Sequence, residues 1–105
     1  MLNKEQFVRI HCKMAEFTAL AKEVSDTAAC AELVRAEYKK APTLYNLNKL
    51  GDALTYYNAV LLNGLEKMHE IQCGEAVIAA LNAEIALVDR EIATVALVRT
   101  ALHRS

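Results

Sequence analysis

The sequence predicts an all-α fold, arranged as a four-helix bundle with antiparallel neighbours and a C-terminal αα-hairpin. Hydrophobic residues make up 54% of the 105 residues, and only one proline and three glycines interrupt the chain. Alanine, the best helix former, is the commonest residue, whereas β-branched residues gather only near the C-terminus. A chain of this length forms one domain, so residues 1–105 are expected to share a single core.

The first part of the chain predicts two helices, over about residues 4–24 and 27–40. Asn3 and Gln6 form a variant of the capping box, and apolar residues then recur at alternating intervals of three and four. The Ser-Asp-Thr triplet at residues 25–27 bonds readily to backbone amides. This triplet therefore predicts the end of one helix and the cap of the next.

The rest of the chain predicts two longer helices, over about residues 43–73 and 75–103. Pro42 disfavours helical geometry in the preceding residue but suits the first turn of a new helix, so it marks the clearest break. Gly74 can adopt the left-handed conformation that closes a helix. Continuing the apolar rhythm beyond Gly74 would also bring polar residues into the seam. We therefore favour a tight hairpin here over one continuous helix.

The helix expected at 75–103 predicts self-association, because its apolar residues are not confined to one stripe. Such a helix must be buried on more than one side, and the short helix at 27–40 cannot cover it. Its isoleucines and leucines resemble the core pattern of two-stranded coiled coils, so a two-fold dimer is the simplest assembly. The alternative is an ordinary four-helix monomer. The expected interface consists of Ile85, Leu87, Val88, Ile92, Val95 and Leu97.

A possible metal site lies in the stretch LEKMHEIQCGEA, residues 65–76. Glu66, His69 and Cys73 share one side of a helix and could reach one ion together. The Glu-x-x-His spacing resembles the signature of ferritin-like di-iron bundles, which implies that a dimer would supply the second half of the site. The alternative is a solvated polar face, with His69 near the negative end of the helix dipole. The second interpretation predicts no metal and no cofactor.

A second candidate site is the stretch YNLNKLGDALTYYN, residues 45–58, which is rich in tyrosine and asparagine. These residues combine flat contact area with hydrogen bonding, so they suit recognition of a protein or a small polar ligand. The alternative is that they only solvate the outer side of a helix. The candidate surface consists of Tyr45, Asn48, Asp52, Tyr56 and Asn58.

Several function classes are disfavoured by composition. The formal net charge is −1 with acidic and basic residues interleaved, which does not suggest a nucleic-acid partner. Apolar runs are too short to span a membrane. Three cysteines without a CxxC spacing fit reduced thiols in the cytoplasm. No nucleophile, base and oxyanion-binding loop are recognisable together, which argues against an enzyme.

The function expected from the sequence is that of a small helical interaction protein. It would act as an adaptor, chaperone or inhibitor, of the kind that a phage or mobile element can encode, and would bind an unidentified protein as a homo-oligomer. Two alternatives remain open: a metal- or small-ligand-binding bundle that uses Glu66 and His69, and a structural assembly subunit.

Overall fold

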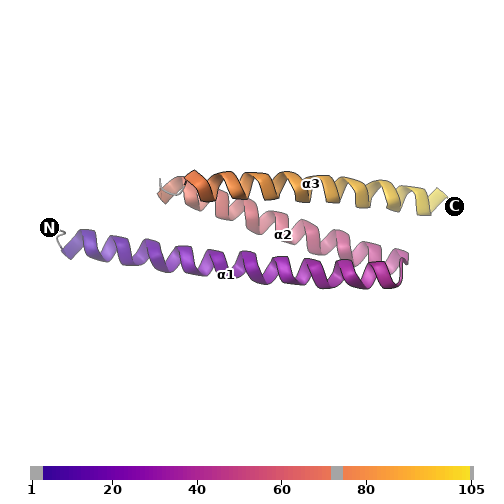
Figure 1. Ribbon diagram of the computed structural model, residues 1–105, viewed down its shortest axis with the longest axis horizontal. Helices are drawn as coiled ribbons and strands as arrows, with labels where there is room; N and C mark the ends of the chain where they lie inside the picture. The colour runs from indigo at the N-terminus through magenta and orange to yellow at the C-terminus, as the bar shows by residue number, and fades with distance from the viewer. Residues whose placement is uncertain (1–3, 72–74, 105) are drawn as a thin grey trace.

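The computed structural model describes residues 4–71 and 75–104, and the all-α prediction is confirmed for them. They form three long helices, α1 (Lys4–Lys40), α2 (Leu44–Ile71) and α3 (Glu75–Arg104). The helices lie side by side along the long axis of a molecule that measures 67 × 19 × 16 Å (Figure 1). In this part of the chain, none of the helices combines the length and hydrophobicity that a membrane span requires.

The prediction of separate helices at 4–24 and 27–40 is wrong, because α1 continues through residues 25–27. The Thr27 hydroxyl donates back to the carbonyl oxygens of Glu23 and Val24, at 2.8 and 3.1 Å. Its hydrogen bond is therefore satisfied inside the helix. Thr27 is also buried, so its side chain packs rather than caps. The described residues therefore form three helices instead of the four that were predicted.

The predicted break at Pro42 is confirmed, and local hydrogen bonds explain its geometry. The last turn of α1 is extended by the Ala41 amide, which donates to the Glu37 carbonyl at 3.0 Å. Thr43 then caps α2, because its hydroxyl accepts from the Asn46 amide at 3.2 Å. The Asn46 side-chain amide donates to the Ala41 carbonyl at 2.8 Å and ties the two helix ends together.

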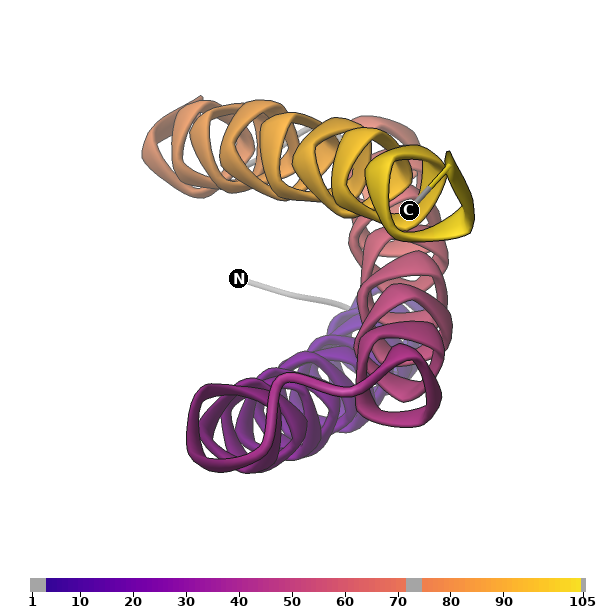
Figure 2. The same cartoon turned by 90° about the vertical axis from the view of Figure 1, so that its right-hand side faces the viewer.

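The core lies along α2, which is the middle helix. α1 packs on one side of α2 and α3 on the other, whereas α1 and α3 do not pack against each other within the described residues. Seen along the long axis, the three helices follow an open arc (Figure 2). The buried core is formed by Leu47, Leu50, Leu54, Tyr57 and Leu61 of α2, Ala31 of α1, and Val88 and Val95 of α3.

Helices α2 and α3 run antiparallel. Gly51 lies against Arg99 and Val95, and seven residues later Asn58 donates to the Asp89 carboxylate at 3.0 Å. A Cβ atom on Gly51 would stand 2.7 Å from Nη2 of Arg99, so glycine permits the close approach of the helices here. The turn predicted at Gly74 lies outside the described residues.

Candidate functional site

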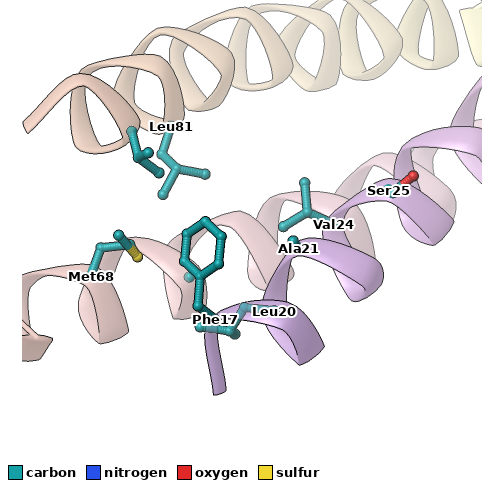
Figure 3. A pocket seen from close by; sticks show the side chains of 9 residues that line it. Phe17, Leu20, Ala21, Val24, Ser25, Met68 and Leu81 are labelled. Carbon is teal, nitrogen blue, oxygen red and sulfur yellow. The ribbon is translucent and has the colours of Figure 1, made fainter. Parts of the chain in front are cut away.

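An apolar groove lies between α1 and α3 and is floored by α2. Its volume is about 250 Å³. Figure 3 shows side chains from all three helices turned towards this space. The groove is lined by Phe17, Leu20, Ala21, Val24 and Ser25 of α1, Gly64 and Met68 of α2, and Val77 and Leu81 of α3.

The groove has large apolar walls and a shallow place in its floor. Phe17 is 43% exposed, and Val77 on the opposite wall is also exposed. In the floor, a Cβ atom added to Gly64 would meet no atom within 4 Å. The walls are therefore only partly covered by the described part of the chain. The shape suits an apolar helix or another elongated apolar group.

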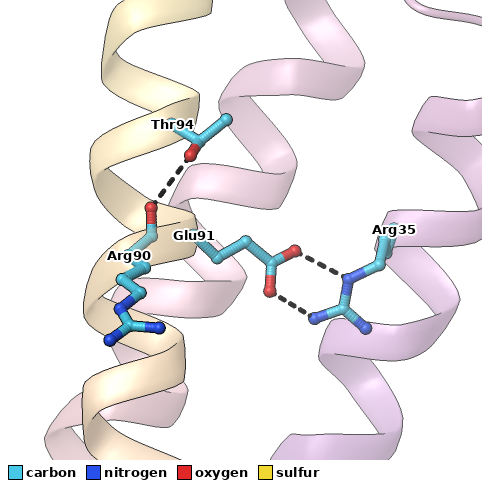
Figure 4. Close-up of polar contacts among 4 residues, drawn as sticks. All are labelled: Arg35, Arg90, Glu91 and Thr94. Carbon is cyan, nitrogen blue, oxygen red and sulfur yellow. Dashed lines mark hydrogen bonds and ion pairs between the residues drawn. The ribbon is translucent and has the colours of Figure 1, made fainter.

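About ten residues further along both walls, an ion pair joins α1 to α3. Nε and Nη2 of Arg35 each donate to a carboxylate oxygen of Glu91 at 2.7 Å, in a bidentate arrangement (Figure 4). The hydrogen bond to Glu91 is the main cause that raises the pKa of Arg35 above its ordinary value. This pair bridges the two walls at that level.

A second, more polar hollow overlaps the groove and shares Val24, Val77 and Leu81 with it. It includes Tyr57 of the floor and Glu84 of α3. Burial raises the pKa of the Tyr57 hydroxyl, and the nearby Glu84 carboxylate raises it further, because a negative charge disfavours the tyrosinate. The walls therefore change from apolar to charged along their length.

Four of the five residues predicted for the tyrosine-rich surface lie together on the outer side of α2. Tyr45 and Tyr56 are 72% and 60% exposed, and Asn48 and Asp52 are exposed between them. The Lys49 ammonium lies 5.5 Å from the centre of the Tyr45 ring. The fifth residue, Asn58, faces α3 instead, where it bonds to Asp89.

The residues predicted for an oligomer interface on α3 divide into two groups. Val88 and Val95 are buried in the chain's own core, and Ile85 and Ile92 pack against that core. Leu87 and Leu97 are more than half exposed. Leu87 is three residues from Glu84 and four from Glu91, so it lies on the side of α3 that faces the open arc.

The residues of the possible metal site lie only partly within the described structure, so this site stays a prediction. Glu66 and His69 are exposed on α2, and Cys73 lies outside the described residues. Among the side chains that the structure describes, in residues 15–70 and 75–104, no three His, Cys, Asp or Glu are placed to share an ion.

Sequence reasoning missed the groove, although two of its signals were present. The apolar rhythm of α1 includes Phe17, and Gly64 interrupts a helix that otherwise favours larger residues. Neither signal points to a groove unless residues 4–40 are known to form one helix. Comparison of the chain with protein-family models, curated proteins and solved structures finds no match.

Proposed function

We propose that the chain is a cytoplasmic, non-enzymatic interaction protein that self-associates and binds another protein, as an adaptor, chaperone or inhibitor. The observation that carries this proposal is the pair of highly exposed tyrosines on the outer side of α2, with Asn48 and Asp52 between them. Tyrosine is favourable at interfaces, because its ring gives a large contact area with few rotatable bonds.

The position of this surface supports recognition of a partner. α2 is clamped on two sides, by α1 and by α3, so its backbone is the most supported of the three helices. Tyr45 and Tyr56 are eleven residues apart, which on a helix returns nearly to the same side after about three turns. They are therefore held on a rigid support about 16 Å apart along the axis, as anchors of an interface commonly are.

The extent of the surface supports self-association. The accessible area of the chain is 7476 Å², whereas a compact monomer of this mass exposes about 5,800 Å². The radius of gyration is 17.7 Å, compared with about 13 Å for a compact domain of this length. The excess area is comparable with what a stable interface buries, and we infer that a second copy covers part of it.

Binding of a protein partner can be tested with a double variant, Tyr45→Ala with Tyr56→Ala. Tagged protein would be used to isolate a partner from the native host, and the purified pair would be titrated by calorimetry. Two anchors of this kind are worth about 1 to 2 kcal/mol each, so the variant should bind at least about tenfold more weakly.

The matched control is Leu33→Ala, which removes another highly exposed side chain from α1. Both variants should keep the helical content and thermal stability of the wild type, because surface substitutions usually change stability by less than about 0.5 kcal/mol. Unchanged affinity in the double variant, or an equal loss in the control, would refute this surface as the binding site.

A further inference from the structure

We propose that the groove between α1 and α3 is filled by the N-terminal arm of α1 from a second copy of the chain, and that the exchange is reciprocal. The arm is defined as residues 4–14. This inference rests on the proposed self-association and names the surfaces that carry it.

In its own chain, α2 ends at Ile71, before it reaches the level of the arm. α1 and α2 run antiparallel, as Lys49 bonds to Glu37 and Phe17 shares the groove with Met68. The same register places Ile71, the last residue of α2, beside about residue 15 of α1. Residues 4–14 therefore extend beyond the end of α2, as the indigo end of α1 shows in Figure 1.

The sequence of the arm is that of an amphipathic helix. Positions 7, 10 and 14 carry Phe, Ile and Met, and continue N-terminally the three-four spacing that includes Phe17. A helix with an apolar stripe and no partner along its length is stable only when another surface covers that stripe. The groove offers such a surface, since its walls are apolar and Phe17 is partly exposed.

The floor of the groove allows a helix to approach closely. Gly64 has no side chain, and the space where a Cβ atom would stand is open to 4 Å. Ala21 on the α1 wall is small as well. Small residues on one helix let the backbone of a neighbour come near, which increases the contact area of a short arm.

Formal charges are complementary between the arm and the end of the molecule that bears the groove. Residues 4–13 carry Lys4, Arg9 and Lys13 against Glu5, which gives 3 − 1 = +2. At that end, residues 66–71 of α2 and 75–84 of α3 carry Glu66, Glu70, Glu75 and Glu84 against Lys67, which gives 1 − 4 = −3. A second copy would bring its basic arm to this acidic end, and complementary charge favours that encounter.

The geometry closes at two copies. Each chain offers one arm and one groove, so two chains related by a two-fold axis satisfy both contacts and leave no free arm to recruit a third. Eleven helical residues are about 16 Å long and cover about 250 Å² with half of their circumference. Two arms and two grooves would then bury about 1,000 Å² in total, which reaches the size of a specific interface.

The first experiment fills the groove. Gly64→Leu puts a side chain into the open floor, and Ala59→Leu adds the same side chain to the exposed outer side of the same helix. Light scattering after size-exclusion chromatography should give twice the 11.6 kDa chain mass for the wild type and for Ala59→Leu. It should give a single chain mass for Gly64→Leu, with helical content unchanged by circular dichroism.

The second experiment reverses charges, and it decides the matter if Gly64→Leu fails to fold. Arg9→Glu with Lys13→Glu, and separately Glu75→Lys with Glu84→Lys, should each weaken the homodimer by at least about tenfold. An equimolar mixture of the two variants should form a heterodimer through the contact in which both sets of charges are reversed. Absence of heterodimer, with both variants folded, would overturn the inference.

The results also separate this inference from the proposal on which it rests. A wild type that stays monomeric at every concentration would overturn both. A dimer that survives the groove and charge variants, but dissociates when Leu87 or Leu97 is changed to glutamate, would overturn only the arm-in-groove contact and would favour an interface on α3.

Discussion

Leu54 is the residue on which the packing of α2 between its neighbours can be tested most directly. Its side chain is 0% exposed at the centre of the core. Replacement by alanine removes about three buried methylene or methyl groups, or about 2.4 kcal/mol of transfer free energy. A residual cavity adds to this loss, so Leu54→Ala should destabilise the chain by about 3 to 5 kcal/mol.

The effect is large enough to measure by thermal unfolding. Unfolding entropy of about 2.1 cal/mol/K per residue gives about 0.22 kcal/mol/K for the whole chain, so the melting temperature should fall by roughly 14 to 23 °C. Leu33→Ala removes the same atoms from a side chain that is 69% exposed, and should change stability by less than about 0.5 kcal/mol. Both would be followed by circular dichroism at equal concentration. Similar losses in the two variants would refute a core centred on α2.

Three further predictions follow from particular contacts. In a double-mutant cycle followed by urea unfolding, Arg35→Ala and Glu91→Ala should show a coupling energy of about 1 kcal/mol, because their bidentate ion pair is partly shielded from solvent. A coupling energy of zero would show that this pair does not stabilise the contact between α1 and α3. Gly64→Ala should raise the free energy of unfolding by about 1 kcal/mol, since the added methyl group is unobstructed, whereas Gly51→Ala should gain less, because its methyl group would crowd α3. Equal melting temperatures of the two variants would contradict this difference. Folding raises the pKa of Tyr57, so its stabilising contribution is complete below pH about 10 and is lost as the pH rises through the pKa of the folded state. In an alkaline titration followed by tyrosinate absorbance at 295 nm, the wild type should show a component at high pH that Tyr57→Phe lacks.

Helical content was predictable because it depends on local sequence, whereas the continuity of α1 was not. Composition and apolar spacing are local signals, and a proline such as Pro42 disrupts the interior of a helix in any fold. Residues 25–27 are ambiguous by comparison, since serine, aspartate and threonine can cap a helix or sit within one. Burial of Thr27 against the rest of the chain favours the second outcome, and that contact is tertiary. Propensity is a weak guide where packing decides.

The candidate surfaces were likewise predictable only in part from the sequence. Tyr45 and Tyr56 were expected on a surface that binds a partner; both are exposed on α2, and their role in binding stays a prediction. The α3 residues could not be assigned to their partners, because an apolar stripe does not specify what covers it. Val88 and Val95 pack on α2 of the same chain, whereas Leu87 remains exposed on the same helix. The groove was missed because it depends on which helix lies in the middle.

The ion pair between Arg35 and Glu91 gives a reason why the arc stays open. Two helices in apolar contact approach to about 8 to 10 Å, and only small or interdigitating side chains stand between them. A bidentate pair of two long side chains, one from each helix, instead spans a wider separation and loses its geometry if the helices close. The pair lies ten residues along α3 from Leu81, so the walls near the groove are fixed at one end by a polar contact. Replacement of both residues by leucine should therefore draw α1 and α3 together and narrow the groove. Because the groove would be narrower, self-association should weaken as well. A double-leucine variant that remains as dimeric as the wild type would show that the separation of the walls is set by other contacts.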